Sequence, residues 1–261
     1  MSHAIGIGKS KIPKTASQDA GLPDEPHHDH EAHQAIRVLK KHAAIEYAGK
    51  SGAALLSAAV PVVGDLAAAA LFATAYTTLY QVEKFARLDI LVGKLLKDLK
   101  GDSPDIKIYP CLKMDEGEPL DIYIKVHQKA NILISIRSKS KSKIIYDQEK
   151  QWIYSRRRYR GRSRWKHCPM EEMNRYVKWL TKNRALFRLS SRHARNLPLI
   201  KIVVIWSPTE IAEHDSENYC YMKGEKILTL NKKGKVYFMG EDKVIDFIKA
   251  CLANEIEYKS A

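Results

Sequence analysis

The sequence predicts an α/β protein in which an Ala-rich helical hairpin precedes a domain with a mixed central sheet flanked by helices. Three observations predict this fold class. Apolar residues recur at helical spacing over 35–99, and short segments rich in β-branched residues follow from residue 105. A helix-spaced segment then separates those strands from a buried strand at 199–206. We expect a disordered tail over 1–34, an apolar helical hairpin over 35–80 and an α/β domain over 81–261.

The N-terminal part contrasts a polar tail with an apolar hairpin. Residues 1–34 contain almost no large apolar side chain, too few to form a core. The Ala-rich segments 52–64 and 66–80 flank Asp65, which is well placed to cap the second helix. Neither segment reaches the roughly 20 apolar residues that a simple membrane span needs. Three interpretations stay open: a hairpin packed in a soluble protein, a shallow membrane hairpin over 46–80, or a partner-binding face, including a helix-mediated oligomer.

The second helix continues beyond residue 80, and strands follow it. Its amphipathic stripe comprises Val82, Phe85, Leu88, Val92, Leu95, Leu96 and Leu99, with Asp89 at the edge of the stripe. Alternating or continuous β-branched residues predict a meander of strands at 105–112, 120–126 and 131–137, which strands at 143–146 and 151–154 extend. A helix over 169–187, the strand at 199–206, strands at 226–230 and 235–239, and a C-terminal helix from about Glu241 complete the prediction.

The positive charge of the chain is concentrated in one segment. The formal net charge is +14, which favours polyanionic partners, either nucleic acid or an anionic membrane surface. Residues 128–166 contain thirteen Lys and Arg against two acidic residues, so this segment carries +11 and the rest of the chain only +3.

Within that segment, residues 139–166 form a basic strip that is a candidate binding surface for nucleic acid, with DNA as the first expectation. Guanidinium groups pair with phosphates in a bidentate manner, and aromatic rings stack on bases or ribose. Nothing in the pattern indicates base-specific recognition. The candidate residues are Lys139, Lys141, Lys143, Arg156, Arg157, Arg158, Tyr159, Arg160, Arg162, Arg164, Trp165 and Lys166.

Four cysteines without a CxxC pair predict reduced thiols rather than a zinc ribbon or a disulfide framework. The N-terminal residues lack the pattern of a secretory signal. We therefore expect a cytoplasmic protein, with association to a membrane surface left open.

The order of the predicted elements over about 85–206 resembles the restriction-endonuclease-like, or PD-(D/E)XK, fold, and more narrowly its nuclease-related (NERD-like) branch. The segment from Gly117 to Asp121 resembles the Gly-x-x-Asp entry to a strand of that family. Residues 132–139 align with the strand that carries the family's acid-x-Lys pair, and Pro169 opens a helix as in the family. Asp89 is the best match for the acidic residue of the first helix. The resemblance implies a nuclease-like α/β domain over 81–261.

The resemblance also implies a metal site, but two of the residues that form this site in the family are replaced in this sequence. In such nucleases two acidic side chains hold Mg²⁺ or Mn²⁺, which polarises the scissile phosphate, and a lysine orients the attacking water. Asp121 and Asp89 are the candidate metal ligands here. Ser135 stands at the position of the second acid and Arg137 at that of the lysine, while Glu172 lies near the family's Gln. A hydroxyl is a poor ligand for a hard cation, and arginine cannot act as a base.

The sequence therefore predicts a protein that binds nucleic acid non-specifically on a nuclease-like fold with an eroded metal site. One alternative is an active Mg²⁺-dependent nuclease, for which Mg²⁺ or Mn²⁺ would be the cofactor. A second alternative is a membrane-associated structural protein that inserts residues 46–80 into a bilayer and places the arginines on lipid headgroups.

Overall fold

The computed structural model describes residues 29–58, 64–100, 105–115, 117–157, 161–189, 197–231 and 234–258, without the side chains of 32, 52–58 and 64–77. The predicted disordered tail therefore lies outside the described residues over 1–28. Residues 29–34 of the predicted tail are helical instead, because helix α1 begins at Asp29. Asp29 fastens this end of the helix to the body: its carboxylate accepts a 3.1 Å hydrogen bond from the Ile108 backbone and pairs with Lys100 at 2.5 Å.

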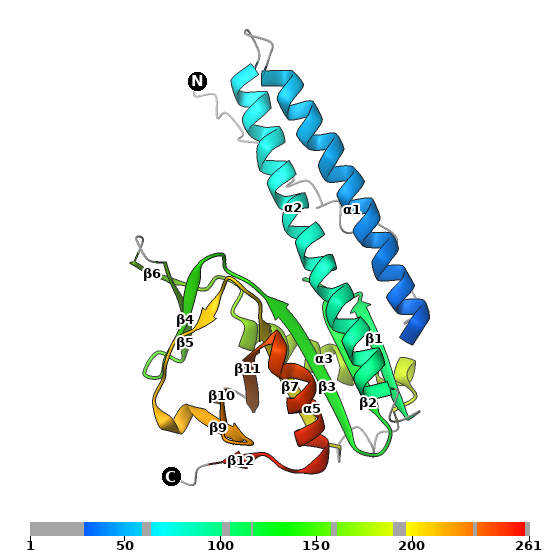
Figure 1. The fold of residues 1–261 in the computed structure, drawn as a ribbon, viewed down its shortest axis with the longest axis vertical. Helices are drawn as coiled ribbons and strands as arrows, with labels where there is room; N and C mark the ends of the chain where they lie inside the picture. Colours follow the sequence, from blue (N-terminus) through cyan, green and yellow to red (C-terminus); the bar gives the residue numbers. More distant parts are fainter. Residues whose placement is uncertain are drawn as a thin grey trace, which may run out of the picture.

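Two long helices form the N-terminal part. Helix α1 (Asp29–Ala58) and helix α2 (Gly64–Leu95) lie side by side and project well beyond the sheets (Figure 1). Helix α2 continues for fifteen residues past the expected boundary at residue 80 and ends in a π-helical turn, η2 (Leu96–Lys100). The boundary therefore falls inside one continuous helix. None of the described helices contains an apolar stretch of the length that a membrane-spanning helix needs.

The main sheet has eight strands and mixed direction, in the order β1-β2-β3-β7-β11-β10-β9-β12. Strands β3, β7 and β11 are parallel, and the remaining neighbours are antiparallel. This confirms the α/β class with a mixed sheet and flanking helices. The strands of this sheet are β1 (Ile106–Leu112), β2 (Leu120–Val126), β3 (Ala130–Arg137), β7 (Leu199–Ile205), β9 (Tyr219–Met222), β10 (Glu225–Asn231), β11 (Lys235–Gly240) and β12 (Glu257–Tyr258).

A second, four-stranded sheet corrects the expectation that residues 143–154 extend the meander. Its order is β6-β5-β4-β8, and it contains β4 (Ser142–Asp147), β5 (Trp152–Arg157), β6 (Gly161–Arg164) and β8 (Glu210–Ile211). The edge of β3 that the meander would have used is occupied by β7, which pairs with it from residue 131 to residue 137. The chain therefore leaves the main sheet after β3 and builds a separate small sheet.

Helices cover both faces of the main sheet. Alternate residues of β2 point to opposite sides, so Ile122 and Ile124 pack with α2 and with α5 (Val244–Ala253). Tyr123 faces the other side, where α3 (Pro169–Lys182) packs. Three 3₁₀ turns, η3 (Arg184–Phe187), η4 (Ser216–Asn218) and η5 (Glu241–Lys243), complete the described elements; the helix predicted over 169–187 thus ends at Lys182.

Candidate functional site

Adjacent strands place Asp121, Ser135 and Arg137 on one face of the main sheet. Strands β2 and β3 are antiparallel with Ile122 opposite Ile134, so Asp121 and Ser135 are the next neighbours across the ladder. Ser135 Oγ donates to Asp121 Oδ2 at 3.4 Å, and the Ile136 backbone N–H donates to the same oxygen at 2.7 Å. Arg137 lies two residues after Ser135 and therefore shares its face; its Nη1 is 3.3 Å from Asp121 Oδ2.

Arg137 joins the two strands to helix α3. Pro169 opens that helix, and Glu172 lies in its first turn, directed at the sheet. Arg137 donates to Glu172 Oε2 from Nη2 at 2.5 Å and from Nε at 3.1 Å. Asp121 and Glu172 are each 2% exposed and Arg137 is 5% exposed. The three expected site residues of the sheet and Glu172 are thus in direct contact in the protein interior.

Lys84 of helix α2 completes the cluster, although sequence reasoning did not select it. Its Nζ lies 2.9 Å from Asp121 Oδ1 and 3.3 Å from Glu118 Oε2. The signal was present in the sequence: Lys84, Leu88, Leu91 and Leu95 recur at the spacing of one helix face, and the three leucines are buried. Lys84, Asp121, Arg137 and Glu172 are called the buried charge cluster below, and the exposed Glu118 lies at its edge.

Opposite charges in the cluster hold its basic groups in the charged form. Burial acts to lower the pKa of Arg137 and of Lys84, but the adjacent carboxylates, Asp121 above all, outweigh it and raise both pKa values above their ordinary range. Burial, together with the nearby Asp121 charge, raises the pKa of Tyr176 to about 12. The hydroxyl of Tyr176 therefore stays protonated beside Arg137 Nη2, at 3.3 Å.

Asp89 does not join this cluster, which corrects its expected role as a partner of Asp121. Its carboxylate faces helix α1 and pairs with His33 and Lys40, each at 2.7 Å, and with Arg37 at 3.4 Å. The reason is helix geometry: Asp89 follows Lys84 by five residues, which turns it about 140° around the helix axis. Asp89 therefore fastens α2 to α1 instead of facing the sheet.

The arrangement does not fit the donor set that Mg²⁺ or Mn²⁺ requires. Those cations bind oxygen ligands with free lone pairs, usually several carboxylates and waters. Both oxygens of Asp121 already accept bonds from Lys84, Ile136 and Arg137, and Glu172 Oε2 is bound by Arg137. Among the residues that the structure describes, no three His, Cys, Asp or Glu side chains are grouped to hold a metal ion.

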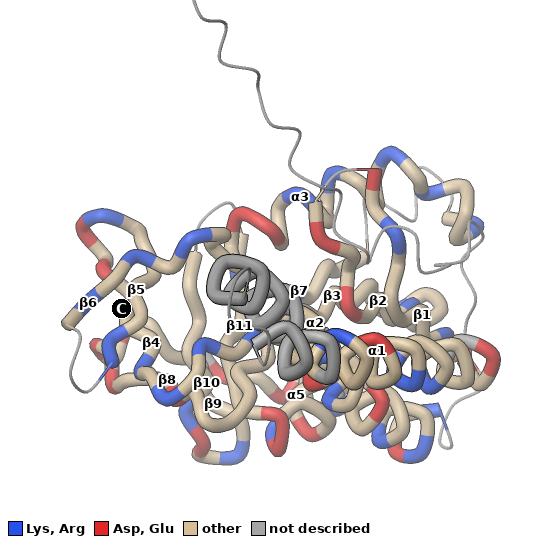
Figure 2. Tube along the Cα trace, turned by 90° about the horizontal axis from the view of Figure 1, so that it is seen from above, with Lys and Arg blue, Asp and Glu red and all other residues tan. Residues whose placement is uncertain are grey.

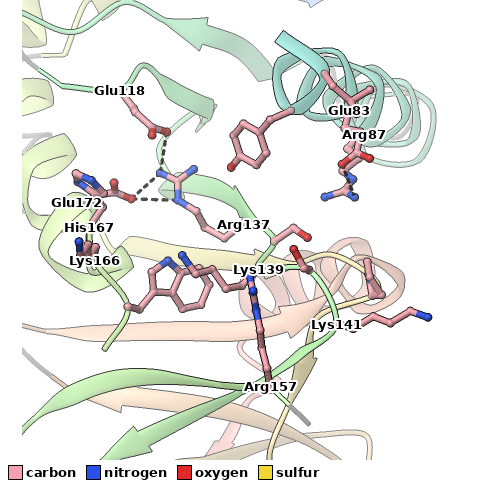
Figure 3. Close-up of a pocket in the computed structure, with 16 residues that line it drawn as sticks. Glu83, Arg87, Glu118, Arg137, Lys139, Lys141, Arg157, Lys166, His167 and Glu172 are labelled. Carbon is pink, nitrogen blue, oxygen red and sulfur yellow. Dashed lines mark hydrogen bonds and ion pairs between the residues drawn. The ribbon is translucent and has the colours of Figure 1, made fainter. Parts of the chain in front are cut away.

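A cleft of about 650 Å³ opens beside the buried charge cluster, and Arg137, Glu118 and Glu172 line it (Figure 3). Helix α2 contributes Tyr80 and the ion pair between Glu83 and Arg87, whose atoms are 3.4 Å apart. The end of β3, the loop that follows it, β5 and the segment before α3 contribute basic residues: Lys139, Lys141, Arg157 and Lys166.

The basic strip lies on the small sheet and the loops around it, at the end of the molecule opposite β1 (Figure 2). Residues Arg158, Tyr159 and Arg160 fall outside the described residues. The expected stacking residue Trp165 is 5% exposed and packs among the apolar side chains that include Ile144 and Ile153. Trp165 is therefore largely covered, although it also lines the cleft described above, so its expected role in stacking stays a prediction.

The register of the small sheet aligns three cations across adjacent strands. Lys143 of β4 pairs with Arg156 of β5, and Arg156 pairs with Arg162 of β6. All three are exposed, and they are called the cationic row below. Of the strip's basic residues within the described ranges, only Lys143 lies within ion-pair distance of a carboxylate, 3.5 Å from the exposed Glu210.

Two aromatic residues that sequence reasoning passed over share the face of the cationic row. Trp152 and Tyr154 alternate with buried residues along β5, and that alternation is the signal that could have found them. The Arg164 guanidinium carbon lies 3.1 Å from the Trp152 ring centre, and that of Arg162 lies 5.2 Å from the Tyr154 ring centre.

Comparison of the chain with protein-family models, with curated proteins and with solved structures gave no significant match.

Proposed function

We propose that this protein binds nucleic acid without sequence preference through the cationic row and its neighbours, on a nuclease-like fold whose metal site has become a buried charge cluster. The order of helix α2, antiparallel strands β1 to β3, helix α3 and strand β7 supports the fold assignment. So does the contact of Asp121, Ser135 and Arg137 on neighbouring strands.

The cationic row is the observation that carries the proposal. Like charges directly opposite one another in a sheet are destabilising. Lys143, Arg156 and Arg162 are nevertheless aligned across three strands. A polyanion whose phosphates neutralise several neighbouring cations turns this repulsion into favourable binding and releases counterions. Trp152 and Tyr154 lie on the same face, and the guanidinium groups placed over their rings add planar cationic surfaces on which bases can stack.

The test is a salt titration of nucleic-acid binding. Wild-type protein should bind several unrelated DNA duplexes and their RNA counterparts with similar affinity, and the logarithm of the affinity should fall linearly with the logarithm of salt concentration. The double variant Arg156→Gln/Arg162→Gln should reduce the slope by about one for each phosphate that the variant no longer neutralises. The matched control Lys129→Gln/Lys178→Gln removes the same charge from exposed sites elsewhere and should leave the slope in place.

Two results would contradict the proposal. Equal slopes for the two double variants would remove the cationic row from the interface. Cleavage of DNA in Mg²⁺ or Mn²⁺ that disappears in Asp121→Ala would instead support the active-nuclease alternative, because the cluster would then have to open and release its carboxylates to a metal ion.

A further inference from the structure

The cleft beside the buried charge cluster has two chemically different sides. Glu118 and Glu83 line one side, and Lys139 and Arg157 line the other, as Figure 3 shows above and below Arg137. Glu83 is engaged by Arg87 and Glu118 by Lys84, at 3.4 and 3.3 Å. In the described part of the chain, by contrast, Lys139, Arg157 and Lys166 have no carboxylate within ion-pair distance.

The cleft and the cationic row lie on opposite faces of strand β5. Side chains alternate along a strand, so Arg157 points to the cleft whereas Arg156 belongs to the row. The two basic surfaces therefore meet different parts of a bound strand. The cleft, at about 650 Å³, has the size of a small-molecule pocket, and the row has the form of an open track.

The acidic side decides what the cleft can accept. A continuous strand passing through the cleft would bring phosphates against Glu83 and Glu118, and ionised carboxylates accept hydrogen bonds but have none to donate to a phosphate. A single nucleotide meets no such conflict, since its phosphate can lie among the basic residues while sugar hydroxyls and base amino groups donate hydrogen bonds to the carboxylates. Tyr80, which lines the cleft and is 42% exposed, offers a ring for the base.

From this geometry we infer that the cleft holds the phosphorylated terminal nucleotide of a nucleic-acid strand, with the phosphate among Lys139, Arg157 and Lys166. The inference rests on the proposed function, because the cationic row holds the rest of the strand. A terminal phosphate carries close to two negative charges at neutral pH, more than a phosphate inside the strand. The ends of strands are therefore bound in preference to their interiors.

The experiment compares a short single-stranded DNA in four forms: with a 5′-phosphate, with a 3′-phosphate, with both ends unphosphorylated, and closed into a circle. One phosphorylated form should bind at least about tenfold more tightly than the circle, the scale of charge-assisted hydrogen bonds. The cleft variant Lys139→Gln/Lys166→Gln should bind all four forms with the same affinity, so that the preference for the phosphorylated end is lost. The row variant Arg156→Gln/Arg162→Gln should weaken all four forms together.

Each outcome has a definite meaning, provided that melting curves show the variants to be folded. Equal binding of the circle and both phosphorylated forms would overturn the inference, as would a preference that survives in the cleft variant. A nucleoside monophosphate should abolish the preference by competition. If it occupies the cleft while no form of the strand shows an end preference, the ligand is a free nucleotide and the strand-end assignment is wrong. Absence of salt-dependent binding to every form would contradict the proposed function itself.

Discussion

The buried charge cluster and the cationic row contain the same types of side chain in opposite settings. In the cluster, Arg137 and Lys84 each contact carboxylates within the protein. In the row, Lys143, Arg156 and Arg162 are exposed and lie beside one another; Lys143 is 3.5 Å from Glu210, whereas Arg156 and Arg162 have no carboxylate within ion-pair distance among the described residues. Charges that are buried must be paired inside the molecule, whereas charges that remain unpaired must be exposed and are available to an outside partner. The first group joins strands β2 and β3 to helices α2 and α3, and the second is open to an outside partner.

This contrast also separates what each region contributes to the electrostatic field around the protein. Two acidic and two basic side chains in contact, as in Asp121, Glu172, Arg137 and Lys84, largely cancel at a distance. The row acts outward over about one Debye length, roughly 8 Å at physiological ionic strength. Substitutions in the cluster should therefore change stability, and substitutions in the row should change binding and its dependence on salt.

The largest effect is expected for Arg137→Met. This substitution leaves Asp121 and Glu172 buried without the cation that both contact, and breaking a buried pair in this way costs about 4 kcal/mol. Urea unfolding should show a correspondingly lower midpoint. The control Arg175→Ala removes an exposed guanidinium 3.6 Å from the same Glu172, and exposed pairs contribute about 0.5 kcal/mol. Similar destabilisation of the two variants would show that the cluster does not stabilise the fold.

The next largest effect concerns the ion pair between Lys84 and Asp121. In a double-mutant cycle of Lys84→Met and Asp121→Asn, the coupling free energy should be about 2 kcal/mol in favour of the native pair. The reason is the 2.9 Å contact between Lys84 Nζ and Asp121 Oδ1 in a site where both are largely buried. Additive effects of the two substitutions would mean that the contact with Lys84 does not stabilise Asp121, which then relies on Arg137, Ser135 and the Ile136 backbone.

Much of the fold follows from local patterns along the chain. The strands at 106–112, 120–126 and 130–137 and the buried strand at 199–205 agree closely with the segments that alternation and β-branched residues predict. The second sheet was not predictable in this way, because pairing between β4 and β8 joins residues far apart in sequence. Nor was the early start of α1, which depends on Asp29 bonding to strand β1 across the molecule.

The site shows the same division between local and long-range information. The two-residue spacing of Ser135 and Arg137 predicts a shared face, and the strand order brings Asp121 beside them. The prediction that Asp89 faces Asp121 is wrong, because a position on the edge of a helical stripe does not reveal which element covers that edge. Here helix α1 covers it, through His33 and Lys40. An aromatic residue among arginines looks exposed in the sequence, whereas Trp165 packs with Ile144 and Ile153 of the small sheet and is 5% exposed.

The stabilisation that Asp89 provides by pairing α2 with α1 should depend on pH. Partial burial acts to raise the pKa of Asp89, but hydrogen bonds from Lys40 and His33 outweigh it, and the pKa lies below its ordinary value. The stabilisation is therefore complete above the unfolded-state value of about 4 and is lost as the pH falls through the lower folded-state value. Asp89→Asn should lower the free energy of unfolding by about 1 kcal/mol at neutral pH and should reduce the loss of stability on acidification. The control Asp246→Asn changes an exposed carboxylate and should leave the dependence of stability on acid pH unchanged.

The smallest effect on stability carries the opposite sign. Arg156 lies between Lys143 and Arg162 across the strands, so Arg156→Gln removes two like-charge pairs at once. Like charges opposite one another cost a few tenths of a kcal/mol each, and the variant should be more stable than wild type by about 0.5 kcal/mol at low salt. Because salt screens exposed charges, the gain should vanish near 1 M salt, where the Debye length is about 3 Å. Thermal unfolding at both salt concentrations measures this directly, with Lys178→Gln as the control. If Arg156→Gln lowers stability at low salt, the row is not a site of unrelieved repulsion, and the cost that a polyanion would relieve does not exist.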